Sequence, residues 1–144
     1  MDKVEIELWQ LISALSGVIG LVSVNIPFVA VGDDFITLAE YIPLLVNDLG
    51  DFVNIFYYFY ITGCLLFFAV IFLGHVYTIV AFGFQMMGGI QIFVLMMDNG
   101  LYSLIRGDGT IDIGMITFVL SIILGFISVS TYAVIVKNGY RNRL

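Results

Sequence analysis

Residues 52–97 read FVNIFYYFYITGCLLFFAVIFLGHVYTIVAFGFQMMGGIQIFVLMM, without one Asp, Glu, Lys or Arg. A single helix of this length would measure about 70 Å, more than twice the ~30 Å hydrocarbon core of a bilayer. The stretch must therefore fold back on itself, and the polar break near its middle is Gly74-His75. We predict a transmembrane hairpin of two helices, 52–73 and 76–97, joined by a tight bend.

The composition of the whole chain also indicates a bilayer environment. Of its 144 residues, 61% are hydrophobic and 11% are charged, and the mean hydropathy is +1.10. Soluble domains contain about 25% charged residues. We therefore predict a single transmembrane domain over residues 1–144, without a separate soluble domain. The single cysteine, Cys64, excludes an intrachain disulfide.

Two further apolar runs, 7–31 and 113–136, are long enough to span a membrane. The segment 35–47 between the first two spans is too apolar for a solvated loop, yet it contains Glu40 and Pro43. It predicts a short interfacial helix broken near Pro43. The predicted fold class is an all-α integral membrane protein with four transmembrane helices in an antiparallel bundle.

Small and polar residues recur at three- and four-residue steps on several predicted helices. These steps place them on one face, where a neighbouring backbone can approach closely. We predict helix packing through Ser13, Ser16, Gly17, Gly20, Gln85, Gly88, Gly89, Gly114, Thr117, Ser121, Gly125 and Ser128. Gln91 falls on a different side of its helix from Gln85, which implies a second partner. Pro27 is expected to kink the end of the first span.

Aromatic and basic residues indicate the expected membrane boundaries and the orientation. Trp and Tyr favour the headgroup level, and cytoplasmic segments carry an excess of Lys and Arg. The predicted interfacial anchors are Trp9, Tyr57, Tyr58, Tyr60, Lys137, Arg141 and Arg143. Four of the five basic residues lie near the termini. We therefore predict cytoplasmic termini, or termini on the equivalent side, and external acidic loops at 32–51 and 98–112.

Few side chains are candidates for chemistry or ligand binding. His75 is the only histidine, and metal or haem sites usually need further nitrogen or sulfur ligands. We interpret it as a turn residue and predict no catalytic residue, metal or cofactor. The acidic loops lack the calcium-loop pattern, so we interpret them as a solvated outer face. Bound lipid is the ligand that we expect.

The function classes follow from these patterns. The chain lacks the common catalytic and nucleotide-binding motifs, and its basic tail is too sparse for nucleic acid. We predict that it is not an enzyme and that it has no nucleic-acid partner or small-molecule substrate.

Helices with more packing faces than one bundle uses would bind other membrane subunits or copies of the chain. The leading hypothesis is a non-catalytic accessory or structural subunit of a larger membrane assembly or lipid-containing particle. One alternative is a small pore-forming protein of the holin or channel type, lined by Gln85 and Gln91. The other is a membrane subunit of an oxidoreductase complex, with His75 at a shared cofactor.

Overall fold

A computed structural model of the chain describes residues 8–31, 33–73, 77–98 and 109–143. The elements in chain order are α1 (Leu8–Asn25), β1 (Pro27–Val31), β2 (Asp34–Thr37), α2 (Leu38–Leu49), α3 (Phe52–Leu73), α4 (Tyr77–Met96), β3 (Gly109–Ile111) and α6 (Ile113–Arg143). Within these described ranges, four helices are long and apolar enough to cross a membrane: α1, α3, α4 and α6. The predicted all-α membrane bundle is confirmed.

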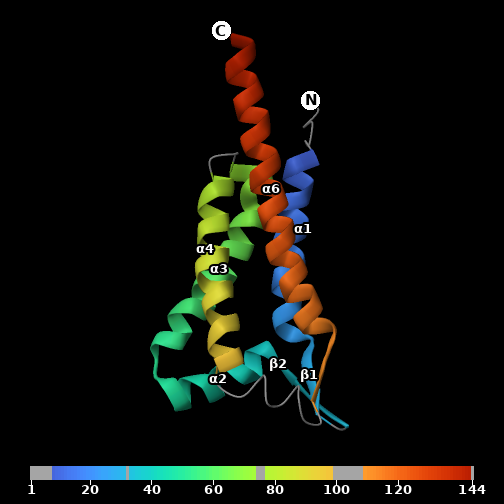
Figure 1. Cartoon of the computed structure of the whole chain (residues 1–144), viewed down its shortest axis with the longest axis vertical. Helices are drawn as coiled ribbons and strands as arrows, with labels where there is room; N and C mark the ends of the chain where they lie inside the picture. The colour runs from blue at the N-terminus through green and yellow to red at the C-terminus, as the bar shows by residue number, and fades with distance from the viewer. Residues whose placement is uncertain (1–7, 32, 74–76, 99–108, 144) are drawn as a thin grey trace.

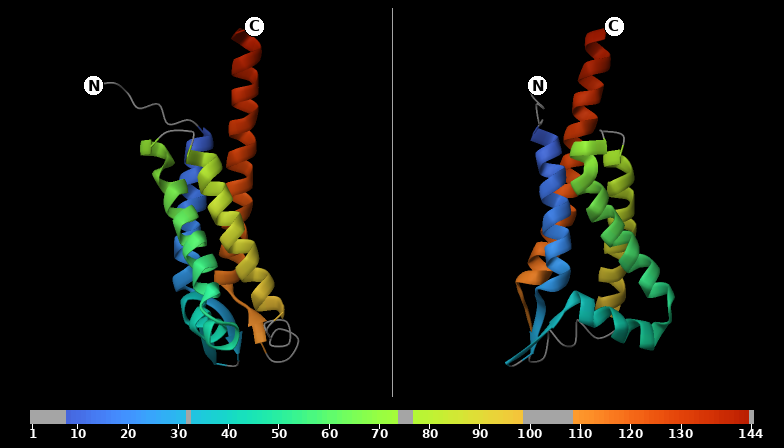
Figure 2. Two further views of the ribbon diagram at one scale, coloured as in Figure 1. Left: turned by 90° about the vertical axis from the view of Figure 1, so that its left-hand side faces the viewer. Right: turned by 180° about the vertical axis from the view of Figure 1, so that it is seen from behind.

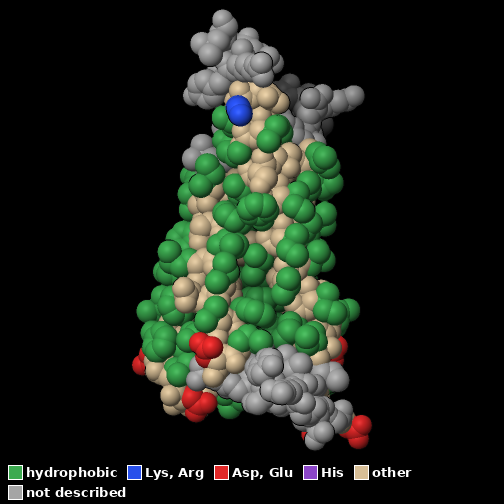
Figure 3. Space-filling model, in the orientation of Figure 1, with side chains coloured by type: hydrophobic (Ala, Val, Ile, Leu, Met, Phe, Trp, Pro, Cys, Tyr) green, Lys and Arg blue, Asp and Glu red, His purple; other side chains and the backbone are tan. Residues whose placement is uncertain are grey.

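The four long helices form two neighbouring pairs (Figures 1 and 2). Helix α1 packs along α6, α3 packs along α4, and the contact of α1 with α3 joins the pairs. Helix α1 begins and α6 ends at the same end of the bundle, which we call the terminal end. Figure 3 shows acidic side chains at the opposite end, which we call the acidic end, and a mostly hydrophobic surface between the two.

The hairpin predicted from residues 52–97 is present. Helix α3 covers Phe52–Leu73, as predicted, and α4 covers Tyr77–Met96, one residue shorter at each end than predicted. The predicted bend at Gly74-His75 lies outside the described residues. Before the hairpin, Gly50 ends α2 with a φ of 113°, a backbone conformation that favours glycine, and its N–H donates to the Val46 carbonyl at 2.8 Å.

The first helix is shorter than predicted. It ends at Asn25 instead of continuing to residue 31, and Pro27 starts strand β1 instead of kinking a helix. A proline disfavours the helical conformation of the residue before it, here Ile26, and its own nitrogen has no hydrogen to donate. Strand β1 pairs antiparallel with both β2 and β3, so the sheet order is β2-β1-β3.

Helix α2 closes the acidic end of the bundle. It runs unbroken from Leu38 to Leu49 with Pro43 inside it, so the predicted break is wrong, and residues 35–37 belong to β2. The Thr37 side chain accepts from the Glu40 N–H while the Glu40 carboxylate accepts from the Thr37 N–H, both at 3.3 Å. This capping box satisfies the first turn of the helix.

Helix α6 is longer than predicted. It continues from Ile113 to Arg143, beyond the predicted end at residue 136. Its 31 residues correspond to about 46 Å, and Figure 1 shows its last turns extending past the other helices at the terminal end. Basic residues near a helix C-terminus interact favourably with the helix dipole, and the tail contains no proline. The helix therefore does not stop where its apolar run stops.

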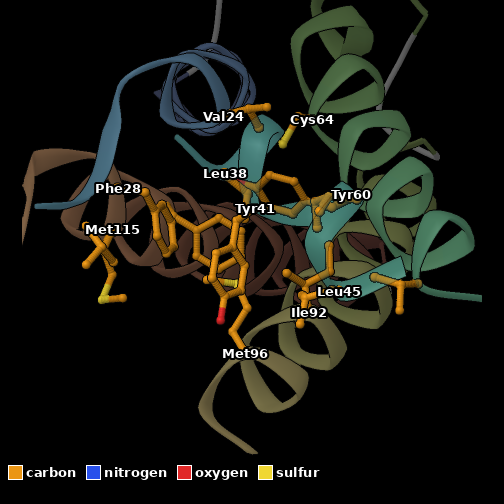
Figure 4. Packing of buried hydrophobic residues seen from close by; sticks show 14 residues of the cluster. Val24, Phe28, Leu38, Tyr41, Leu45, Tyr60, Cys64, Ile92, Met96 and Met115 are labelled. Atoms are coloured by element: carbon orange, nitrogen blue, oxygen red, sulfur yellow. The ribbon is translucent and has the colours of Figure 1, made fainter. Parts of the chain in front are cut away.

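The hydrophobic core occupies the acidic half of the bundle, where α2 packs beneath α1, α3 and α4 (Figure 4). The Tyr60 and Phe118 rings have centroids 4.7 Å apart, and Phe28 meets Phe118 edge to face at 5.8 Å. The ring of Tyr60 is thus fixed between α3 and α6, which directs its hydroxyl toward the polar groups described next.

Candidate functional site

Buried polar side chains form a series along the inside of the bundle. They come from α1, α3, α4 and α6, and each is fully buried. We name this series the polar seam: Ser13, Ser16, Ser23, Tyr60, Gln85, Ser121 and Ser128. Because lipid supplies no hydrogen-bond partners, polar groups in a spanning bundle must find them in the protein.

The Tyr60 hydroxyl joins three helices at the acidic side of the seam. Its oxygen lies 2.8 Å from Ser121 Oγ on α6 and 3.3 Å from Ser23 Oγ on α1. Ser121 Oγ donates to the Phe118 carbonyl at 2.8 Å, and Ser23 Oγ donates to the Gly20 carbonyl at 2.6 Å. The Tyr60 hydroxyl also lies 3.5 Å from the Gly20 carbonyl, to which it can donate, and either oxygen can be the donor in the Tyr60–Ser121 pair.

Gln85 occupies the middle of the seam. Its Nε2 donates to Ser16 Oγ at 3.3 Å and lies 3.7 Å from Cys64 Sγ, while Ser16 Oγ donates to the Ser121 carbonyl at 2.6 Å. Among the described residues, Gln85 Oε1 has no hydrogen-bond partner, and the same is true of Thr78 Oγ1. The amide nitrogen therefore links α4 to α1 and α3, and the amide oxygen contributes nothing to that link.

The terminal side of the seam joins α1 to α6. The hydroxyls of Ser13 and Ser128 pair with each other, and Ser128 Oγ donates to the Trp9 carbonyl at 3.1 Å. The Trp9 ring packs against Tyr132 with centroids 5.3 Å apart and is 4% exposed. The structure thus places this predicted anchor inside the bundle.

Glycines bring the helix backbones into contact beside the polar seam. A Cβ at Gly17 on α1 would overlap the Cys64 carbonyl on α3. A Cβ at Gly88 on α4 would overlap the Phe56 carbonyl, which is also on α3. Gly63 makes the reciprocal contact with the Gln85 backbone on α4. Gly63 is not among the packing residues predicted from the sequence. A glycine inside an apolar helix, where it lowers helix propensity, is the signal that would have found it.

The remaining predicted packing residues occupy different environments. Ser13, Ser16, Gly20, Gly89, Gly114, Ser121, Gly125 and Ser128 are buried. A Cβ at Gly114 would meet the Pro27 carbonyl, and one at Gly125 would meet Gln85 Oε1. Thr117 is half-buried and bonds to the Ile113 and Gly114 carbonyls of its own helix. Among the described residues, no hydrogen bond joins its side chain to another helix, in contrast to its predicted role.

The predicted interfacial anchors also differ in how far they are buried. Tyr60 is fully buried, so its assignment to the membrane boundary is wrong. Tyr58 is 63% exposed, Tyr57 is half-buried and Lys137 is exposed. The backbones of residues 141 and 143 lie in α6, and their side chains fall outside the described part of the structure. His75 also lies outside it.

The small-residue faces predicted on α1, α4 and α6 all pack within the single chain, and so does Gly63 on α3. The outer face of α4 differs, because Gly83, Met87 and Gln91 are all exposed there. Among the described residues, Gln91 has no hydrogen-bond partner. Its side chain points away from the side of α4 that holds Gln85. We call Gly83, Met87 and Gln91 the α4 outer face.

A hydrophobic furrow lies between α4 and α6 toward the acidic end. It has a volume of about 430 Å³ and is lined by Phe93, Ile111, Met115, Ile116, Val119, Leu120 and Ile123. A second hollow of about 240 Å³ shares Phe93, Val119 and Ile123 with it. Large apolar side chains line both hollows, so the furrow offers no small-residue face to a helix.

The acidic end carries exposed carboxylates: Asp33, Asp34, Glu40, Asp48 and Asp51. Burial, reinforced by the charge of Asp48, raises the pKa of Tyr41 on α2 above its ordinary value. Tyr41 therefore stays neutral at physiological pH. Within the described residues, no group of three or more His, Cys, Asp or Glu side chains could hold a metal ion.

The polar seam holds four helices together through hydroxyl, amide and carbonyl groups. Its hydrogen bonds connect groups within this one chain. The exposed amide of Gln91 on α4 is not part of the seam. Comparison with protein-family models, with curated proteins and with solved structures finds no match to this chain.

Proposed function

We propose that this chain is a non-catalytic accessory or structural subunit of a larger membrane assembly or lipid-containing particle, which acts by helix packing. The observation that supports this proposal is the exposed amide of Gln91 on a spanning helix. Gln91 lies five residues before the end of α4, about 8 Å inside the span. A polar group at this depth gains from a protein partner, because hydrocarbon offers none.

The test is the size of the particle that contains this chain after gentle solubilisation of its own membrane. We expect a complex larger than the 16.0 kDa chain with its detergent. Gln91→Leu should reduce the share of chain in that complex, whereas Thr62→Leu, which removes an exposed hydroxyl from α3, should not. A chain that migrates as a monomer under every mild condition would overturn the proposal.

We further propose that both termini are cytoplasmic, or on the equivalent side, and that the acidic end is external. In support, α1 begins and α6 ends at one end of the bundle, and Lys137 is exposed near that end. Arg141 and Arg143 follow in the sequence, and an excess of basic residues favours the cytoplasmic side.

The lipid expected from the sequence would lie in the furrow between α4 and α6. Its wholly apolar lining and bulky side chains suit a thin, flexible acyl chain better than a helix. Val119→Trp should fill the furrow and lower the amount of phospholipid retained by the purified protein in native mass spectrometry. Val22→Trp, on the exposed side of α1, is the matched control.

Pore formation is a second proposal, supported by the outward direction of Gln91. Several copies could surround a water path with this amide, but Gln85 would not contribute, since it is enclosed between Ser16, Cys64 and Gly125 of its own bundle. Release of a trapped dye from liposomes that contain the purified protein would support this function. Intact liposomes at every protein-to-lipid ratio would contradict it.

A further inference from the structure

We propose that the α4 outer face is the interface for a second copy of this chain, with Gly83 and Gln91 at its centre. This inference rests on the proposed function and names the partner. Two independent features of the described structure meet on this face: a glycine that lines an open groove and has no neighbour within 4 Å of its Cβ position, and an exposed amide without a hydrogen bond.

Gly83 differs from the other described glycines of the spanning helices. A Cβ placed at Gly83 would meet no atom within 4 Å, whereas each of the others would touch a neighbouring element. Glycine in a helix interior costs about 1 kcal/mol relative to alanine. No contact among the described residues offsets this cost, and a partner that approaches from outside the chain would explain the open space beside Gly83.

Gln91 lies on the same face as Gly83. The residues Gly83, Met87 and Gln91 follow one another at steps of four, which keeps them on one side of the helix, and all three are exposed. A groove of about 170 Å³ surrounds Gly83 and is bounded by Val80, Phe84 and Met87. A small residue beside a groove lets a second helix approach closely, and an amide two turns away can then bond across the contact.

A second copy fits this face better than an unrelated helix because the face is self-complementary. For two copies that share the orientation proposed above, a two-fold axis normal to the membrane places each residue of this face near its counterpart. A glutamine amide carries both a donor and an acceptor. Two Gln91 side chains can therefore exchange N–H···O bonds, and two Gly83 backbones can approach at the groove.

Asp98 opposes this pairing. It is exposed and lies seven residues after Gln91, about 10 Å farther along the helix and close to water. Like charges at that position repel, but solvent and salt screen exposed charges over about 10 Å at 0.1 M ionic strength. We therefore expect the dimer to strengthen as salt concentration rises.

The test uses the full chain, purified and reconstituted alone in phosphatidylcholine vesicles. Met87→Cys places a thiol on the α4 outer face, and Val22→Cys places one on the exposed side of α1 as the control; the native Cys64 is buried in both. A short thiol-specific cross-linker should join Met87→Cys chains into dimers and leave Val22→Cys chains single. Equal cross-linking of the two would overturn the proposal.

Two further changes are then made in the Met87→Cys chain. Gln91→Leu should lower the association constant by about tenfold, since two interhelical hydrogen bonds are lost. Gly83→Leu should abolish cross-linking by filling the groove, while the fold of the single chain survives because no described atom lies within 4 Å of a Cβ at Gly83. Thr62→Leu should have no effect. Cross-linking that is unchanged by both Gln91→Leu and Gly83→Leu would contradict the interface.

Failure of this inference can be told from failure of the proposed function. A purified chain that stays monomeric in vesicles, together with a large native complex held by chains of other sequence, would overturn the second copy and retain the subunit function. A monomer in vesicles and in native membranes would overturn both. A dimer in vesicles that loses stability with Gln91→Leu supports both.

Discussion

Gly83 and Gly88 lie five residues apart on α4 and have opposite surroundings. The first has open space above it, and the second lies against the backbone of α3 at Phe56 and Tyr60. The same residue type thus marks an outer face in one case and a helix crossing in the other. Sequence spacing grouped Gly88 with Gln85 and Gly89 on one packing face, but it gave no indication of what lies beside Gly83.

This difference predicts unequal effects of alanine. Gly88→Ala should destabilise the protein by about 1–3 kcal/mol, because a methyl group there overlaps backbone atoms that cannot move without parting the helices. Gly83→Ala should be neutral or stabilising by up to about 1 kcal/mol, since alanine favours helix. Unfolding by denaturing detergent, followed by circular dichroism of the monomeric protein, measures both. Equal losses for the two variants would contradict the crossing at Gly88.

Tyr60 provides a second comparison at the residue scale. Tyr60→Phe removes the hydroxyl that joins α1, α3 and α6 but leaves Ser23 and Ser121 bonded to carbonyls of their own helices. We expect a loss of about 1 kcal/mol in unfolding free energy. Tyr58→Phe, at a position 63% exposed, is the control and should change stability little. An effect of Tyr58→Phe as large as that of Tyr60→Phe would refute the role of the seam.

The misassignment of Tyr60 has a simple geometric cause. Successive helical residues point about 100° apart, so five consecutive aromatics at 56–60 cannot all face the headgroups. One of them must point inward, and the run itself does not say which. The positions of Ser23 on α1 and Ser121 on α6 decide it, and both are far away in the sequence.

At the scale of elements, the stability of α2 depends on the capping hydrogen bonds of its first turn. The Thr37 side chain accepts the Glu40 N–H, and several apolar residues of the helix, including Leu38 and Leu45, are buried beneath the bundle. A capping box followed by an apolar run is readable in the sequence. The sequence does not show that α2 tolerates Pro43. The helix does so because Pro43 is exposed on its outer side.

Removal of the cap should loosen α2. Thr37→Ala is expected to cost about 1 kcal/mol and to speed amide hydrogen exchange in the first turn about fivefold, because the Glu40 N–H loses its acceptor. Asp48→Ala is the control at the other end of the same helix. A carboxylate there is unfavourable to the helix dipole, so its removal should not speed exchange. Faster exchange in both variants would argue against a specific capping effect.

The strands could not be predicted from local sequence. The segment Pro27–Val31 is apolar and continues an apolar helix, which favours a longer span when it is considered alone. It becomes a strand because Pro27 stops the helix and because β3, some 80 residues later, pairs with its second edge. Val29 aligns with Ile111 across that edge, and Asp112 N–H donates to the Phe28 carbonyl at 3.1 Å.

At the scale of the whole molecule, charge is divided between the two ends. Asp48 is exposed at the acidic end and Asn138 is exposed near the terminal end, so each can report on one side of the membrane. In intact cells, a membrane-impermeant maleimide should label Asp48→Cys and should label Asn138→Cys only after permeabilisation. The buried Cys64 should not react in either case. The reverse pattern would show that the acidic end faces the cytoplasm.

The sequence by itself determined the solvent, the four spans and the hairpin, because transfer into hydrocarbon depends on local runs of apolar residues about 20 long. It also located the small and polar faces through the helical period. Only the tertiary structure decided which of those faces meet each other. It turned Tyr60 inward and enclosed Gln85, and it left Gly83 and Gln91 outside. These choices depend on contacts between residues far apart in the chain, and a periodic pattern shows that a face exists without identifying what packs against it.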